Sequence, residues 1–187
     1  MKKSTMILLG VLAVIVIIIS MLGGSYNSLV TKQEQVDKEL ANIDVQLERR
    51  ADLIPNLVIT VKGYTSHESE IIDKITSARE NLLKADSVSE KSTANNELTS
   101  ALNALMVVVE NYPDLKSNQN FIQLSDELAG TENRIATARR DYNDSVTSYN
   151  TSIKKFPTNI LAGMFGFEKK DYFEVSEGKT DVPNVEF

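Results

Sequence analysis

The chain lacks the residues from which many metal and redox sites are built. Its 187 residues include no cysteine and a single histidine, His67. Without cysteine there is no disulfide bond and no thiolate metal site, which suits an extracytoplasmic location without establishing one. A zinc-peptidase helix needs a second histidine four residues after His67, but position 71 is isoleucine. A zinc site of that kind is therefore excluded.

Other familiar site types are also missing from the sequence. No glycine-rich phosphate loop occurs, and a serine nucleophile would have only one histidine in the chain to activate it. Acidic residues outnumber basic ones, 26 to 20, and the two signs are interspersed. Nucleic-acid binding requires a basic face. We therefore predict a protein that is not an enzyme, with no cofactor, no metal and no nucleic-acid partner, and the sequence leaves small-molecule ligands open.

A long apolar run near the amino terminus is the clearest feature that is present. Residues 6–22 read MILLGVLAVIVIIISML and follow Lys2 and Lys3. This length meets the requirement of about 17 to 25 residues for a helix that crosses a bilayer. We predict a short basic terminus over residues 1–5 and an uncleaved transmembrane anchor over residues 6–24. A cleaved signal peptide is the competing interpretation, although its apolar stretch is usually shorter and ends in a small-x-small site.

A heptad-like stripe begins directly after the anchor. Alternating steps of three and four residues from Tyr26 meet apolar side chains, with interruptions at Gln33, Arg50 and Glu68. Such a stripe lies on one face of a helix and is typical of coiled-coil-like packing. We therefore predict a helix over residues 26–84.

Pro55 lies inside this predicted helix, where it removes a backbone donor and distorts the preceding turn. The stripe keeps its phase across Pro55, which favours a bent continuous helix. Alternatively, Asp52 caps a new helix with Pro55 in its first turn. We favour the bend, because the segment RRADLIPNLV supplies no residues for a chain reversal.

Two further helices are predicted downstream. A polar connection over residues 86–92 precedes a helix that ends near Asn111. The last helix, over about residues 118–156, carries bulky side chains at intervals of seven and mostly small residues between them. The bulky row is Phe121, Leu128, Ile135, Tyr142, Tyr149 and Phe156. Small residues allow a neighbouring helix to approach closely, so an antiparallel bundle is expected.

These elements predict an all-α protein: a transmembrane helix followed by an antiparallel bundle over residues 25–167. The bundle has three long helices, the first bent at Pro55. The first is much longer than the others at ~1.5 Å per residue. Either the bend folds it into an arrangement that approaches a four-helix up-and-down bundle, or a second copy of the chain covers part of the stripe. We interpret residues 168–187 as an extended acidic tail.

Several long segments resemble the bacterial LemA family. They are YNSLV, VQLERRADLIPNLV and VKGYTSHE in the first half, and NYPDLKSNQNFIQLSDELAGTENRIATARRDYNDSVTSYN, KKFPTNILAGMFGF, DYFE and VPNVEF in the second. The resemblance covers nearly the whole chain. It implies a single-pass membrane protein with a bundle similar to an up-and-down four-helix arrangement, and a sharper bend near Pro55. It implies no reaction, because the family has no agreed catalytic residues or ligand.

Two charge clusters lie beside the predicted seams, one on each of the long helices. We expect their arginines to pair with acids across the bundle, with an anionic ligand as the alternative. Arg50 occupies a stripe position, so we expect it to be partly buried and to need a partner. The clusters comprise Arg49, Arg50 and Asp52 on the first helix and Arg139, Arg140 and Asp141 on the last.

The segment over residues 160–167, ILAGMFGF, is unusually apolar for a connection after a helix. Packing onto the end of the bundle is one explanation. The alternatives are shallow insertion at the membrane interface or contact with a partner. The candidate contact residues are Ile160, Leu161, Met164, Phe165 and Phe167.

The anchor, the seams and the lack of a catalytic motif predict a non-enzymatic scaffold or adaptor of the bacterial envelope that binds protein partners. A homo-oligomeric membrane-organising protein is one alternative. An enzyme or ligand-binding protein of unfamiliar type is another, resting on Arg49, Arg50, His67 and Glu68. The basic amino terminus places the domain outside the cytoplasm of the cell, although members of the resembled family are often drawn the other way.

Overall fold

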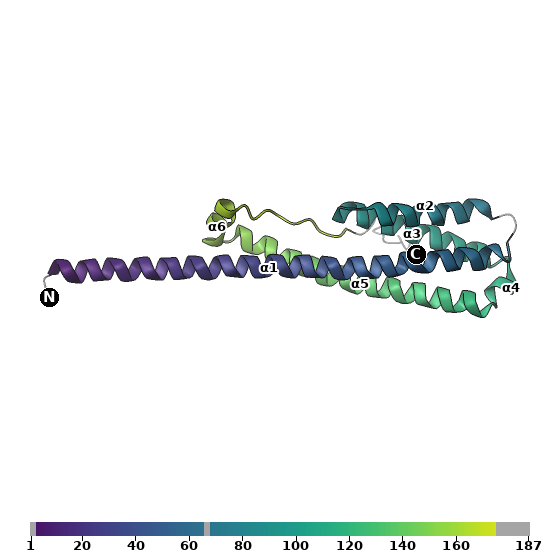
Figure 1. Cartoon of the computed structure of the whole chain (residues 1–187), viewed down its shortest axis with the longest axis horizontal. Helices are drawn as coiled ribbons and strands as arrows, with labels where there is room; N and C mark the ends of the chain where they lie inside the picture. The colour runs from purple at the N-terminus through teal and green to yellow at the C-terminus, as the bar shows by residue number, and fades with distance from the viewer. Residues whose placement is uncertain (1–2, 66–67, 175–187) are drawn as a thin grey trace, which may run out of the picture. The chain divides into compact units, whose positions relative to one another are not determined.

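The computed structural model describes residues 3–65 and 68–174, and every regular element in them is a helix. The helices are α1 (Lys3–Lys62), α2 (Ser69–Lys84), α3 (Val88–Val109), α4 (Pro113–Lys116), α5 (Gln119–Lys154) and α6 (Thr158–Phe165) (Figure 1). The all-α class predicted from the sequence is confirmed.

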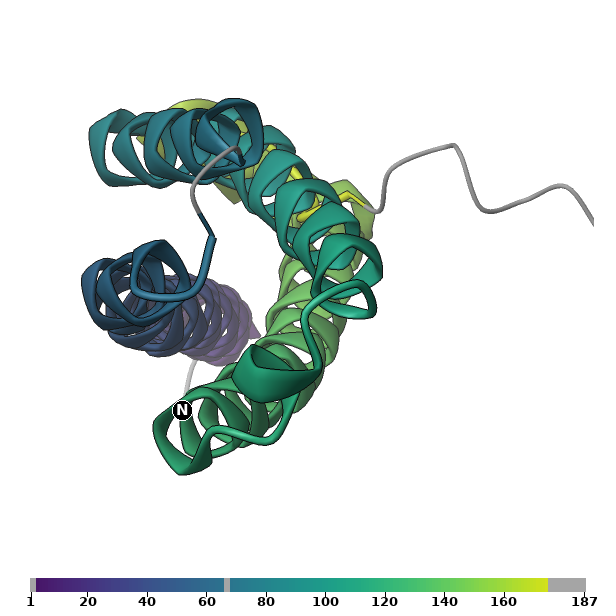
Figure 2. The same cartoon turned by 90° about the vertical axis from the view of Figure 1, so that its right-hand side faces the viewer.

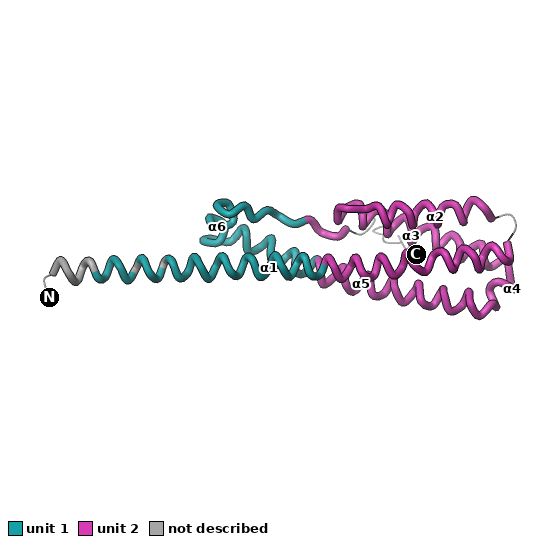
Figure 3. Tube along the Cα trace, viewed as in Figure 1, with its two compact units in different colours: residues 1–39, 143–170 teal, residues 40–142, 171–187 magenta. Residues whose placement is uncertain are grey.

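The chain divides into two compact units that share α1 and α5 (Figure 3). Unit 1 contains residues 1–39 and 143–170, and unit 2 contains residues 40–142 and 171–187. The parts of α1 and α5 that belong to unit 2 lie side by side with α2 and α3, as Figures 1 and 2 both show. Unit 2 is therefore a four-helix bundle.

Polar contacts between the helices of unit 2 define their directions. On α1 and α5, Gln46 pairs with Arg134 whereas Arg49 pairs with Glu127, so these two helices are antiparallel. On α1 and α3, Asp44 pairs with Lys91 and Arg50 with Asn95, so these two helices run the same way. Directions that alternate along the chain are those of an up-and-down bundle.

The core of the bundle consists of the stripe that the sequence displays. On α1 the stripe positions from Ile43 to Val61 are buried, and so is the bulky row of α5 from Phe121 to Tyr142. Removing these side chains from water supplies the main stabilising free energy of the bundle. The fully or nearly fully buried set includes Ile43, Leu47, Ile54, Leu57, Val61, Leu98, Leu105, Phe121, Ile135 and Tyr142.

The prediction of one helix over residues 26–84 is wrong in its second half. Helix α1 passes through Pro55 and ends at Lys62, and α2 begins at Ser69. The chain therefore reverses after Gly63 rather than at Pro55, and three predicted long helices become four. The stripe did not indicate this break, because the apolar residues Tyr64 and Ile71 keep its phase on either side of the polar connection.

Helix α1 tolerates Pro55 because a side chain replaces the missing backbone donor. Proline has no N–H, so the carbonyl of Ala51, one turn earlier, has no partner within the helix. Arg79 of α2 donates from Nε to this carbonyl at 2.8 Å. Ala51 itself is fully buried, so the bond satisfies an oxygen that water cannot reach.

Helix α3 begins at a capping box that the polar connection conceals. The Ser87 hydroxyl accepts from the backbone N–H of Glu90, and the Glu90 carboxylate accepts from the backbone N–H of Ser87. Both groups satisfy amides that the first turn of a helix leaves free. The spacing Ser-x-x-Glu is the sequence signal for this start.

Unit 1 contains the first part of α1, the end of α5 and α6. Lys32 of α1 donates to the Ser148 hydroxyl of α5 at 2.8 Å, and Leu29, Val36 and Tyr149 are buried. The seven-residue row ends differently: Phe156 is 81% exposed. Helix α6 follows directly and is capped by Gly166, whose φ of 72° favours glycine.

The predicted tail begins with a segment that packs rather than extends away. Residues 168–174 have no helix, yet Phe173 is 1% exposed in unit 2, where the Tyr142 hydroxyl donates to the carbonyl of Asp171 at 2.8 Å. In unit 1 the Asn150 side chain makes two bonds with the backbone of Lys170. Residues 175–187 lie outside the described residues.

Candidate functional site

Arg50 is the most deeply buried charged side chain among the described residues, at 3% exposure. Its Nη1 donates to Asn95 of α3 at 2.7 Å and forms an ion pair with Glu132 of α5. The same Glu132 carboxylate accepts from the hydroxyl of Thr99 on α3. Three helices of unit 2 thus meet at one guanidinium, which we call the Arg50 cluster.

The electrostatics of the Arg50 cluster are those of a structural group. Burial lowers the pKa of Arg50 below its usual value, and the neighbouring Glu132 carboxylate opposes this shift. Burying a charge without a partner costs several kcal/mol, whereas pairing and hydrogen bonding offset most of that cost. Because its charge is balanced by Glu132, the cluster offers little net field to an anionic ligand.

The other residues of the two predicted charge clusters do not join Arg50. Arg49 pairs with Glu127 at 3.1 Å on the exposed side of α1, and Asp52 is exposed. On α5, Arg140 lies beside Asp141 at 3.5 Å, and Arg139 is half-buried. The two predicted clusters are therefore separate.

The residues behind the enzyme alternative also fail to converge in the described part of the chain. His67 lies outside the described residues. Glu68 accepts from the hydroxyl of Tyr112 at 2.9 Å near the start of α2. Glu68 follows the end of α1 at Lys62. Arg50 lies about 18 Å along the helix axis before that end, at ~1.5 Å per residue. Among the described residues no three acidic or histidine side chains are grouped to hold a metal.

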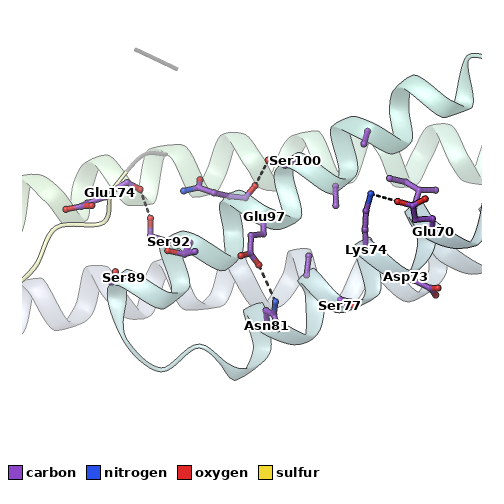
Figure 4. Close-up of a pocket in the computed structure, with 16 residues that line it drawn as sticks. Glu70, Asp73, Lys74, Ser77, Asn81, Ser89, Ser92, Glu97, Ser100 and Glu174 are labelled. Carbon is purple, nitrogen blue, oxygen red and sulfur yellow. Dashed lines mark hydrogen bonds and ion pairs between the residues drawn. The ribbon is translucent and has the colours of Figure 1, made fainter. Parts of the chain in front are cut away.

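A groove runs between α2 and α3 in unit 2 (Figure 4). Its walls carry small, polar and charged side chains, and Asn81 donates to Glu97 across it at 3.2 Å. Near the start of α3 the Ser92 hydroxyl donates to the carbonyl of Glu174. The groove is open to solvent, and several of its polar groups bond to one another. Its lining includes Lys74, Ser77, Ala78, Thr93, Asn96, Ser100, Ala101 and Ala104.

The five predicted contact residues near the carboxyl end lie in unit 1, on or just after α6. Leu161 is buried, whereas Met164 is 73% exposed, and Ile160 and Phe165 are also exposed. Phe167 is half-buried and its ring contacts Tyr26 of α1 edge to face, with centroids 5.7 Å apart. One face of this segment therefore packs and the other is exposed, and contact of the exposed face with a membrane or a partner stays a prediction.

Sequence reasoning missed two partners. Asn95 completes the Arg50 cluster, and Arg79 satisfies the helix at Pro55. The signal for Asn95 is a polar residue three positions before Leu98 on the buried face of α3. The signal for Arg79 is Pro55 itself. A proline within a helix predicts one carbonyl without a partner in the preceding turn, but it does not predict which side chain donates to that carbonyl.

Comparisons with known proteins identify a family for the chain. A family model described as LemA family matches residues 39–187. Magnetosome protein MamQ 1 of Paramagnetospirillum magneticum is 32% identical over 195 residues, covering 90% of this chain and 71% of the relative. Protein LemA of Metamycoplasma hominis is 30% identical over 166 residues, covering 87% of this chain and 75% of the relative.

Proposed function

The chain belongs to the LemA family, and from this premise we propose that it is a non-enzymatic helical scaffold, anchored in the membrane, that binds protein partners. One observation carries the proposal: the apolar run and the stripe of the bundle belong to the same helix, α1. The apolar part is long enough to cross a membrane, and none of its described side chains is buried in the protein. An unburied run of this kind is expected to lie in lipid.

The end of the bundle where α1 and α3 finish offers a surface for a partner. Ile59 of α1 is 69% exposed and Val107 of α3 is 71% exposed, with Met106 beside it. Ile122, in the first turn of α5, is also exposed. Exposed apolar side chains on three helices near one end of the bundle support a role in protein binding.

Photocrosslinking in intact membranes tests the scaffold role. We expect a photoreactive residue in place of Val107 to crosslink a defined membrane or envelope protein, and Ile59→Ser to weaken the crosslink. The matched control places the same group at Asn133, which is exposed on α5. Equal crosslinking at both positions, or none at Val107, would contradict the proposal. Strong stabilisation by a metabolite in a thermal-shift screen would instead favour the ligand-binding alternative.

A homo-oligomer is the second candidate, favoured by the same apolar end. In that case Val107 crosslinks to a second copy, and the detergent-solubilised protein elutes as a multiple of 20.8 kDa after correction for bound detergent. A monomer that still crosslinks to another protein supports the adaptor.

We also propose that the bundle lies outside the cytoplasm, because Lys2 and Lys3 precede the span. The chain has no cysteine, so Asn133→Cys provides a unique thiol. An impermeant thiol reagent should label it in intact cells. Labelling only after the cells are broken would place the bundle inside.

A further inference from the structure

Helix α6 lies level with the end of the apolar run within unit 1. The ring of Phe165 contacts Tyr26 edge to face, with centroids 4.9 Å apart. Met21 and Gly24 of α1 line one groove together with Lys155 and Thr158. Met21 and Gly24 belong to the predicted span, so these contacts place the start of α6 beside its last turn (Figure 1).

The exposed side chains of α6 include three large apolar ones, of which Phe165 also contacts Tyr26 of α1. Met164 is 73% exposed, Phe165 58% and Ile160 53%, whereas Leu161 and Ala162 are buried. Phe156, just before the helix, is the most exposed large apolar side chain among the described residues, at 81%. Water is a poor solvent for such a cluster, and contiguous apolar surface usually marks an interaction site.

The charges around α6 fit one particular partner. Lys154 and Lys155 immediately precede Phe156 and are exposed. No acidic residue occurs between Asp144 and Glu168. Lysines beside exposed aromatic and aliphatic side chains match a phospholipid surface, whose phosphates attract cations while the acyl boundary accepts apolar groups.

We propose that α6, with the preceding Lys154–Phe156 segment, is an interfacial helix that lies on the phospholipid surface of the membrane that α1 crosses. Phe156, Ile160 and Met164 enter the acyl boundary, and the lysines contact phosphate. The span brings this surface to α6, so a shallow apolar face suffices for binding. The inference needs the anchor and does not depend on the scaffold role.

Tryptophan fluorescence with brominated lipids tests the proposal, since the chain has no native tryptophan. Full-length Met164→Trp is reconstituted in phosphatidylcholine and phosphatidylglycerol vesicles, with or without bromine on the acyl chains near the headgroup. Because an interfacial side chain reaches this depth, we expect bromine to reduce emission about two-fold. The matched control, Val107→Trp, is 71% exposed in unit 2 and should show no quenching.

Each remaining outcome decides the question. Emission of Met164→Trp that is red-shifted and unquenched, like that of Val107→Trp, means that α6 faces water and overturns the proposal. Blue-shifted emission without quenching means that a protein surface or a second copy covers α6, which also overturns it. Phe156→Trp provides an independent reporter in the segment before α6 and should be quenched as well. Failure of the scaffold crosslink leaves these readings unchanged.

Discussion

Tyr149 and Phe156 follow one seven-residue row at the end of α5, but the protein covers only Tyr149. Tyr149 is 1% exposed and Phe156 is 81% exposed. The spacing that predicts burial is identical for both. What differs is the neighbour: Tyr149 lies on the part of α5 that packs along α1, whereas Phe156 comes after α5 has ended at Lys154.

The difference shows that a periodic row indicates which face is apolar and not what covers it. In unit 2 the stripe is covered by three other helices and by the Arg50 cluster. In unit 1 the row ends at Phe156, just before α6, where the proposed cover is lipid. In water or detergent, the free energy of unfolding therefore depends on the covered side chains of unit 2 and much less on the exposed apolar side chains of α6 in unit 1.

Truncating the two aromatic side chains should give the largest contrast. We expect Tyr149→Ala to reduce the free energy of unfolding by about 3 kcal/mol, because it leaves a cavity in a packed seam. Phe156→Ala should change it by less than about 0.5 kcal/mol in detergent, where nothing in the protein covers the ring. Urea unfolding followed by circular dichroism measures both. Equal losses of the free energy of unfolding in the two variants would contradict the conclusion that the protein covers only Tyr149.

Arg49 and Arg50 are neighbours on α1 and allow an exposed and a buried arginine to be compared within unit 2. Arg50→Met removes the cation shared by α3 and α5, leaves Asn95 without its donor, and should cost about 3 kcal/mol. Arg49→Met removes a pair in which both side chains are more than 40% exposed, so less than about 1 kcal/mol is expected. The same urea titration reports the difference. A similar cost at both positions would show that the Arg50 cluster contributes nothing beyond a surface pair.

A double-mutant cycle tests whether Arg79 compensates for Pro55. Arg79→Met leaves the buried carbonyl of Ala51 unpaired and should cost about 1 to 2 kcal/mol. In a Pro55→Ala background the backbone N–H of position 55 meets that carbonyl, and the cost of losing Arg79 should shrink. Additive effects would mean that the two residues act independently.

The smallest expected effect concerns the start of α3 and depends on pH. Backbone N–H bonds from Ser87 and Asp86 lower the pKa of Glu90 below its usual value. A lowered folded-state pKa stabilises the fold above the unfolded pKa, and this contribution is lost as the pH falls through the folded pKa. Glu90→Gln should therefore lower the melting temperature slightly at pH 7 and not at strongly acid pH. A gap that stays constant with pH would contradict this cause.

Much of unit 2 follows from residue patterns alone. The stripe positions on α1 and the bulky row on α5 predict which side chains are buried, because helical periodicity places them on one face. The position of the reversal was not predictable from the stripe. Gly63 and the polar residues after it are the better signal, and Pro55 misleads because a side chain distant in sequence satisfies its helix.

The candidate site was less predictable than the fold. Arg50 stands out as a charged residue within an apolar stripe, but its contact with Asn95 depends on the register between α1 and α3, which no local pattern specifies. The apolar character of residues 160–167 is plain from the sequence. Which of them point outward depends on the turn at Phe156 and on the contact between Phe165 and Tyr26.

Spin-label accessibility in vesicles tests most directly the claim that unit 1 presents a membrane face and unit 2 a water face. Single cysteines replace Ile17 in the apolar run, Met164 on α6 and Val107 at the end of α3, in a chain that has no other cysteine. Relaxation by oxygen relative to a water-soluble nickel reagent then ranks their depths. We predict that Ile17→Cys is deepest, Met164→Cys lies at the interface and Val107→Cys is in water. Equal accessibility of Met164→Cys and Val107→Cys to the nickel reagent would contradict it.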